Sequence, residues 1–471
     1  MVATLPRGIE EGIAPFKFSR MCGKMPVMKN LKYINNRCDM KKIIRAALLP
    51  LVVVLAFCSC TKYEKVGGGG NDGEKVFDIL TADNFAVNAG EKNVFKIGRS
   101  QDGYRWLLDG REVSTASTYE FTPVKQGTYA ITLETSAGKY ECSVDVLRPV
   151  TDNSSKWISD IVEYRPAPGQ FINASSWGTY ERARSIIGEQ PELGERGGVS
   201  LGGFGGYIIF KFDHTVVNQN GYDFVIRGNA FDGSSEPGAV MVAFDRNGNG
   251  VPDDDEWYEL AGETYNPASG GYEYTVKKNF TVTYTRPDDI SKAVDVSWSA
   301  SDGTSGYIYA NVFHSQPYWP LFVDGDPAHM TFTGTCLSNL SIDRSEEMGM
   351  EGEYWYSAAA GKGYADNYSE EYDDIVNLDP QTARSNKFDI SNAVDAQGNK
   401  VRLSGADFIK VYTCINQSSG WLGEGSTEVC GAISLTSGPL SGQSDPYASG
   451  EGSTEVCGAI SLSAKKKFLC F

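Results

Sequence analysis

The stretch Val240–Glu259, VMVAFDRNGNGVPDDDEWYE, runs from an apolar segment into acidic and amide residues and then returns to aromatic ones. The letters after Phe244 match the spacing D-x-[DN]-x-[DN]-G-x₅-E of a calcium-binding loop. Calcium takes about six to eight oxygen ligands, and this spacing supplies side-chain oxygens, one backbone carbonyl and a glycine for the sharp turn. The predicted ligands are Asp245, Asn247, Asn249, Val251 through its carbonyl, Asp253 and Glu256.

The residues on either side of this loop indicate strands. Val240–Phe244 is an apolar run of strand length, and Pro252 stands where a helix after the loop would have to begin. We therefore expect a calcium loop between two strands, with the ion stabilising the fold, and not a helix-loop-helix hand. Asp, Asn and Gly also form ordinary solvated turns, so an ion-free hairpin tip is the alternative.

Composition limits the class of protein. The chain has 471 residues, enough for two or three domains, with 52 glycines and 12% aromatic residues. Such a composition is typical of β-rich exported proteins and not of disordered chains. The formal net charge is -17, and an acidic surface repels phosphate backbones. We expect no nucleic-acid partner.

An export signal is predicted near the start. From Met40 the chain reads MKKIIRAALLPLVVVLAFCSC, with basic residues followed by the apolar run Ala46–Phe57. This run is too short for a membrane span and has the length of a signal peptide. The stretch resembles a bacterial lipoprotein signal, which implies that Cys60 is lipidated and anchors the protein to a membrane. A plain secretory signal is the alternative.

The segments around this signal complete the N-terminal region. Residues 1–39 carry no recognisable signal, so we interpret them as a leader from a mis-assigned start, with 40–60 as the signal peptide and lipobox. Residues 61–76 are polar and glycine-rich, which is typical of a flexible tether.

Short alternating segments between residues 77 and 150 predict a small β-sandwich. The strings YRWLLDG (Tyr104–Gly110), YEFTP (Tyr119–Pro123) and GTYAITLE (Gly127–Glu134) resemble a PKD-like, immunoglobulin-like module. Such modules are usually spacers, so we expect Trp106 in its core and no ligand site. Cys142 has no partner cysteine inside the module.

The main body is predicted over residues 157–435, with a helix-compatible piece around Tyr180–Ile187. Its glycine-rich part, Gly202–Gly206, is followed by a strand-like run and lacks the lysine of a phosphate loop, so we reject a phosphate site there. Glycines at that place favour close sheet packing or a bulge.

Several unusual strings of the body occur in the order of one family. They are SLGGFGGYIIFKFDH (200–214), GYDFVIRGNAF (221–231), SSEPGAVMV (234–242), WYELAG (257–262), GYADN (363–367), KFDISNAVDAQGNKV (387–401) and ADFIKVYTCINQSSGWLGEGSTEV (406–429). With the calcium loop, they resemble a family of Bacteroides cell-surface lipoproteins. The resemblance implies an all-β chain with few short helices, in which the PKD-like sandwich precedes a larger, jelly-roll-like β-sandwich.

The resemblance also implies a cellular location and binding partners. Members of the family often accompany outer-membrane uptake systems, so we expect a lipid-anchored protein of the outer membrane, at the cell surface. The expected partners are an outer-membrane transporter or a surface glycan or corrinoid ligand. In the family the acidic end of the calcium loop is often one residue shorter, which leaves open whether Asp255 or Glu256 closes it.

Two further groups of residues are candidate sites. Oxygen-rich strand ends predict a second ion or polar site, although such residues also cap turns. Its candidates are Asp223, Asn229, Glu236 and Asp366, with Asn367 beside it. Aromatic residues predict a groove that stacks sugars or rings, with core packing as the alternative. These are Tyr318, Trp319, Tyr354, Trp355 and Tyr356.

Catalytic motifs are scarce. The three histidines, His214, His314 and His329, form no zinc motif, and no GxSxG elbow occurs. A binding or accessory role in nutrient acquisition is therefore favoured over an enzyme. A glycan-active hydrolase is the alternative, because its two carboxylates meet only in space.

Cysteines and the C-terminus complete the predictions. We expect buried thiols or a disulfide, with Cys414 and Cys430 as the pair that would form it. The string GEGSTEVCGAISL occurs at 423–435 and again at 450–462. The first copy is expected to form the last strand, and residues 436–471 a duplicated, poorly ordered tail.

Overall fold

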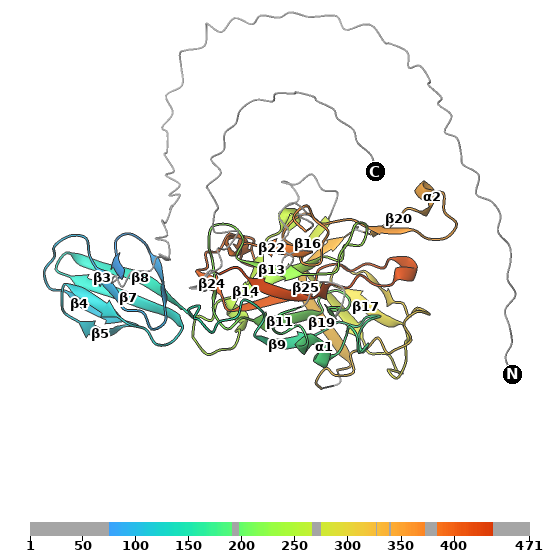
Figure 1. Ribbon diagram of the computed structural model, residues 1–471, viewed down its shortest axis with the longest axis horizontal. Coiled ribbons are helices and arrows are strands. Elements are labelled where there is room, and N and C mark those ends of the chain that lie inside the picture. Colours follow the sequence, from blue (N-terminus) through green and yellow to red (C-terminus); the bar gives the residue numbers. More distant parts are fainter. Residues whose placement is uncertain are drawn as a thin grey trace, which may run out of the picture. The chain divides into compact units, whose positions relative to one another are not determined.

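The computed structural model describes residues 75–190, 197–265, 275–325, 327–338, 341–372 and 384–436. In these ranges the chain is nearly all strand, with two short α-helices, α1 (Tyr180–Arg184) and α2 (Ser345–Met348) (Figure 1). The all-β sandwich class is confirmed. Neither helix has the length and apolar character that a membrane span requires. The predicted leader, signal, Cys60 and nearly all of the tail lie outside the described residues.

The N-terminal sandwich pairs a three-stranded with a five-stranded sheet. The first has the order β1 (Lys75–Asp78), β3 (Asn93–Lys96), β6 (Thr118–Phe121), and the second β2 (Asn84–Asn88), β8 (Gly138–Leu147), β7 (Gly127–Thr135), β4 (Arg105–Leu108), β5 (Arg111–Ser114). Alternate residues of these strands share one apolar cluster that includes Trp106. The Trp106 indole N–H donates to the carbonyl of Ala116 at 3.0 Å, so the polar atom of this buried ring has a hydrogen-bond partner. Trp106 is a core residue, as expected.

The body contains a second sandwich. Its six-stranded sheet has the order β23 (Ala393–Val394), β15 (Trp257–Leu260), β14 (Gly238–Ala243), β25 (Phe408–Thr413), β11 (Tyr207–Lys211), β9 (Asp160–Arg165). The facing sheet has the order β22 (Ser385–Phe388), β13 (Phe224–Arg227), β27 (Gly431–Ser434). The first copy of the repeated string therefore forms the last described strands, β26 (Glu428–Val429) and β27.

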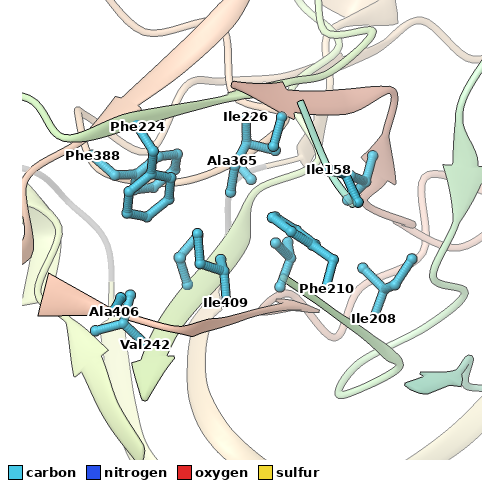
Figure 2. Packing of buried hydrophobic residues seen from close by; sticks show 14 of the residues in the cluster. Ile158, Ile208, Phe210, Phe224, Ile226, Val242, Ala365, Phe388, Ala406 and Ile409 are labelled. Atoms are coloured by element: carbon cyan, nitrogen blue, oxygen red, sulfur yellow. The ribbon is translucent and has the colours of Figure 1, made fainter. Parts of the chain in front are cut away.

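The core of this sandwich follows from strand alternation. Ile208 and Phe210 of β11 and Ile409 of β25 point toward Phe224 and Ile226 of β13 (Figure 2). Phe224 stacks on Phe388 of the neighbouring strand, with ring centroids 5.2 Å apart. Burial of each such side chain stabilises the fold by roughly 1.5–3 kcal/mol.

A four-stranded sheet also belongs to the body. It has the order β18 (Ser305–Ile308), β17 (Val296–Ala300), β16 (Thr275–Thr285), β19 (His329–Ser338). Its apolar face packs around Phe204, Tyr284 and Trp319.

Two-stranded ribbons complete the described strands: β10 (Val199–Ser200) with β26, β12 (Val216–Val217) with β24 (Gly405–Ala406), and β20 (Ser341–Asp343) with β21 (Trp355–Ser357). The 3₁₀ turns are η1 (Asp254–Glu256), η2 (Glu263–Tyr265), η3 (Ile390–Asn392) and η4 (Gly420–Leu422).

The glycine-rich segment packs closely, as predicted. A Cβ on Gly206 would clash with the carbonyl oxygen of Leu201 and the nitrogen of Ala167, and one on Gly205 would clash with Phe332. Strand β11 follows directly, so no helix begins there.

The disulfide between Cys414 and Cys430 is not formed. Cys142, Cys336, Cys414 and Cys430 are all buried free thiols. The Cys414 thiol donates to the carbonyl of Pro237 at 3.1 Å. Burial raises the pKa of Cys142 and of Cys336 to about 12, so these two thiols stay protonated. The expectation of buried thiols is the one that the structure supports.

Candidate functional site

The candidate calcium loop connects β14 to β15, which pair antiparallel with Ala243 opposite Trp257. The loop therefore lies between two strands, as the flanking residues predicted. Only the single 3₁₀ turn η1 precedes β15. The loop is held by its own hairpin and by Asp407, whose Oδ2 accepts the N–H of Asp245 at 2.9 Å.

The buried carboxylate of Asp245 organises the first half of the loop. Its Oδ1 accepts the N–H of Asn249 at 3.0 Å, and its Oδ2 accepts the N–H of Gly250 at 2.8 Å. Gly250 has φ +82°, a left-handed conformation that glycine adopts without strain. The glycine at the sharp turn thus serves the purpose that the spacing suggested.

Asp253 brings the amide side chains together. Its Oδ2 accepts from the Asn247 amide nitrogen at 2.6 Å and from the Asn249 amide nitrogen at 2.8 Å. The amide oxygens point toward the backbone: Asn247 Oδ1 accepts the N–H of Asn249, and Asn249 Oδ1 accepts the N–H of Val251, each at 2.8 Å. Each of these oxygens keeps a second lone pair that a cation could share after rotation of the side chain. Three side chains that can offer oxygen therefore meet at one point of the loop, which fits a hard cation such as calcium.

The acidic residues at the end of the loop differ in burial and in the direction they face. Glu256 is 2% exposed, and its two oxygens accept the N–H groups of Arg246 at 2.8 Å and of Asp253 at 3.2 Å. Burial raises the pKa of Glu256 above its ordinary value. Asp255, 83% exposed, pairs outward with Arg246 at 2.9 Å. Glu256 and not Asp255 faces the loop. The Val251 side chain is exposed.

A second acidic group lies in the interior of the body. Glu236 precedes β14, Asp366 belongs to the GYADN segment, and Glu428 lies on β26. Among the described residues, these form the only group of three or more His, Cys, Asp or Glu side chains whose ligand atoms all lie within 4.8 Å of one another. The carboxylates of the calcium loop are spread farther apart.

Hydrogen bonds hold the acidic group in place. Asp366 accepts the N–H groups of Asn229 at 2.8 Å and Ala230 at 2.9 Å through Oδ1, and that of Glu428 at 2.9 Å through Oδ2. Glu236 Oε1 accepts the N–H of Ser426 at 2.9 Å. The backbone around these carboxyls is therefore organised to hold them.

Burial and mutual repulsion govern the charge of the group. Burial, with help from Asp366, raises the pKa of Glu236 to about 8, and burial raises the pKa of Asp366 to about 7. Burial and the two neighbouring acids raise the pKa of Glu428 well above its ordinary value. Three carboxylates this close cannot all be charged, so protons or a cation must neutralise them.

The structure brings together part of the predicted second site. Glu236, Asp366 and the backbone of Asn229 meet, and Asn367 adjoins Asp366. Asp223 lies apart from this group. Its carboxylate accepts the backbone N–H groups of Gln219 at 2.7 Å and of Ile390 at 2.8 Å. Sequence reasoning did not select Glu428, because it lies far along the chain and joins the others only through strand packing.

The five aromatic candidates do not form one surface. Tyr318 and Trp319 are each 1% exposed and pack in the core of the four-stranded sheet, the alternative that the sequence left open. Tyr354 is exposed and Trp355 and Tyr356 are half-buried, with Trp355 and Tyr356 on β21. The Trp355 indole N–H donates to Glu353 at 2.8 Å.

A cavity of about 130 Å³ lies beside the four-stranded sheet. The segment Ile415–Ser418, which follows β25, supplies another part of its wall. The lining residues are Gly203, Phe204, Tyr284, Trp298, Tyr307, Ile308, Ile415, Asn416, Gln417, Ser418, Glu424 and Gly425. Glu424 is the one carboxylate among them. Sequence analysis quoted this residue in two strings but did not select it as a site.

Comparison with known proteins adds little to this geometry. No protein-family model and no curated protein matches the chain. The crystal structure of a quinonprotein alcohol dehydrogenase-like protein from Bacteroides thetaiotaomicron VPI-5482 matches at 18% identity and TM-score 0.13, over 17% of this chain and 20% of that one. The N-terminal eight Ig domains of Down syndrome cell adhesion molecule, isoform 1.30.30, match at 10% identity and TM-score 0.12, over 71% of this chain and 53% of that one.

This chain therefore spans about a fifth of the first structure and about half of the second. Likenesses at such low TM-scores carry no argument about function. The described residues define an all-β sandwich protein, and the resemblance to surface lipoproteins stays a prediction.

Proposed function

We propose that this protein is a calcium-stabilised binding or accessory component of nutrient acquisition, anchored to the outer membrane by lipid at Cys60. The single observation that carries the calcium part is the meeting of Asn247 and Asn249 at Asp253 Oδ2, at 2.6 and 2.8 Å. This meeting occurs in a loop whose letters match the calcium template throughout.

A bound ion would link the two strands of the hairpin. Asp245 and Glu256 approach the loop from its two strands, and each carboxylate oxygen keeps a second lone pair when it accepts one N–H. Calcium held by these oxygens and by the side chains of Asn247, Asn249 and Asp253 would tie β14 to β15. The ion would thus stabilise the sheet and take no part in chemistry.

The placement of the acidic residues favours binding over hydrolysis. A glycosidase needs two carboxyl groups about 5–10 Å apart on either side of an accessible sugar bond. Asp366 and Glu428 are almost fully buried, and Glu424 is the only carboxylate that lines the cavity in the described ranges. We therefore assign the protein to capture or scaffolding of a glycan or corrinoid, beside an outer-membrane transporter.

The anchor and the spacer role rest on sequence. The signal-like run before Cys60 and the glycine-rich tether support attachment to the membrane. A PKD-like identity of the N-terminal sandwich would make it a stalk that carries the body away from the lipid.

The test is a thermal unfolding series on the mature full chain. Protein stripped with EDTA is compared with the same protein in calcium and in magnesium. A ligand that binds only the folded state stabilises it by about 2.7 kcal/mol at a hundred times its Kd. Calcium should raise Tm by several degrees and magnesium much less. An unchanged Tm in calcium would contradict the proposal that calcium stabilises the hairpin.

A further inference from the structure

The carboxyl group of Glu424 is buried and only half satisfied. Its side chain is 6% exposed, and Oε1 accepts the N–H of Gln170 at 2.6 Å. Among the residues that the structure describes, Oε2 has no hydrogen-bond partner. A buried polar atom without a partner costs roughly 1–3 kcal/mol, so its retention in a cavity wall requires an explanation.

Four aromatic side chains line the same cavity, and three of them lie on adjacent strands. Tyr284 lies on β16, Trp298 on β17 and Tyr307 on β18. The Tyr284 hydroxyl donates to the carbonyl of Phe204 at 3.1 Å, so its polar end is already satisfied. Tyr307 is half-exposed, which gives the cavity an edge open to solvent.

We propose that this cavity binds a small organic ammonium group, such as a quaternary ammonium head, with Glu424 as its counter-ion. The proposal rests on the binding role given above and names the chemistry of one ligand. Aromatic rings attract cations through the negative charge of their faces, by up to about 2 kcal/mol when water is excluded. A carboxylate with a free oxygen supplies the opposite charge.

Size favours this class over a sugar ring. A dry cavity of about 150 Å³ holds benzene, with about six non-hydrogen atoms. The cavity at Glu424, about 130 Å³, has room for a group of that size. A tetramethylammonium ion fits, whereas a hexose with its hydroxyl groups is roughly twice as large.

Proton release accompanies binding. Burial raises the pKa of Glu424 to about 8, so the empty site is mostly protonated at neutral pH. The titratable groups that feel its charge are Glu236, Tyr284 and Tyr318, and none of them is a cation. When an ammonium group enters, the carboxyl proton leaves to solvent and an ion pair forms. Affinity for the cation should therefore weaken about tenfold per pH unit below 8 and level off above it.

The experiment is calorimetric titration of the mature full chain at constant ionic strength between about pH 6.5 and about pH 9. This range brackets the raised pKa of Glu424, about 8. The probes are tetramethylammonium chloride, tert-butanol as its neutral counterpart of similar shape, and methyl glucoside. We expect tetramethylammonium to bind at least about tenfold more tightly than tert-butanol.

Variants separate the roles of the lining residues. Glu424→Gln keeps the size of the side chain and an acceptor for Gln170, but it should lower the affinity about tenfold or more and remove the pH dependence. Tyr307→Leu, at the exposed edge, should weaken binding several-fold without affecting folding. Glu351→Gln, an exposed carboxylate outside the lining, is the matched control and should bind like the wild type.

Equal binding by the wild type and Glu424→Gln, or by tert-butanol and tetramethylammonium, would overturn the proposal. Binding of methyl glucoside alone would overturn the ammonium assignment and leave the capture role intact. Tetramethylammonium binding without any response to calcium would instead contradict the proposal that calcium stabilises the hairpin. It would leave the ammonium site unaffected.

Discussion

Asp253 Oδ2 lies 2.8 Å from the amide nitrogen of Asn249, and the two residues belong to opposite halves of one hairpin loop. The same oxygen lies 2.6 Å from the amide of Asn247. The turn from Phe244 to Glu256 contains only one short 3₁₀ turn, η1, so contacts of this kind decide its shape. They also make Asp253 the most informative position for testing calcium.

Replacement of Asp253 should remove the calcium response. Asp253→Asn keeps the size of the side chain but removes one negative charge from the ligand set, which lowers affinity for a hard cation. We expect the calcium-induced rise in Tm to fall to less than about a third of the wild-type value, while Tm in EDTA changes by about 2 °C or less. Differential scanning calorimetry measures both. Asp255→Asn, which faces solvent, is the control and should respond to calcium normally.

The buried acidic group should make stability fall as pH rises. Its carboxyl groups have folded pKa values raised from 4.5 to about 8 for Glu236 and from 3.8 to about 7 for Asp366. A raised folded pKa means that the native state holds its proton more tightly, so this stabilisation is full below the unfolded pKa values and is lost as pH rises through the folded ones. In EDTA, Tm should drop by on the order of 5 °C between pH 5 and 8.5.

A variant of Glu428 tests the cause of that fall. Glu428→Gln removes one acid from the group and should flatten the pH dependence of Tm, with the gain over wild type largest at high pH. Glu351→Gln, exposed, should follow the wild-type curve. A wild-type Tm that stays level over this range would contradict the raised pKa values.

The packing between the body's two facing sheets should dominate its stability. Phe210 is fully buried beside Ile208 and Ile409 (Figure 2). Phe210→Ala should cost about 3–5 kcal/mol, because it loses apolar contact and leaves a cavity. Urea denaturation followed by tryptophan fluorescence measures the loss. Phe231→Ala, at an exposed position, should cost less than about 0.5 kcal/mol.

The four described cysteines should react only after unfolding. Burial in apolar surroundings keeps Cys142, Cys336, Cys414 and Cys430 protonated and out of contact with reagent. Iodoacetamide added to native protein without reductant should leave their peptides unmodified, and the same reagent in guanidinium should alkylate all four. Mass spectrometry of the peptides distinguishes the cases. A linked pair of peptides containing Cys414 and Cys430 would show that the thiols are oxidised.

Local features of this protein could be predicted because they depend on neighbouring residues. The turn between Phe244 and Trp257 was placed between strands from the apolar run before it and from Pro252. Trp106 was expected in a core because it lies in a small β-module without a ligand site, and α1 appears where the helix-compatible segment was expected. Each of these depends on backbone geometry and side-chain pattern over a few residues.

Features that join distant parts of the chain could not be predicted in this way. Tyr318 and Trp319 are as suitable for a groove as for a core, and only their burial against the four-stranded sheet decides between the two. Cys414 and Cys430 lie sixteen positions apart in sequence, yet β25 and β26 direct them to different neighbours.

The amino-acid sequence by itself determined the strand pattern, the acidic loop with its ligand spacing and the signal-like segment before Cys60, since short-range spacing encodes all three. Only the tertiary structure decided that Glu428 meets Glu236 and Asp366, and that Glu424 shares a cavity with four aromatic side chains. Strand pairing sets these distances, and the pairing partner of a strand depends on the burial of whole sheets, which no local pattern specifies.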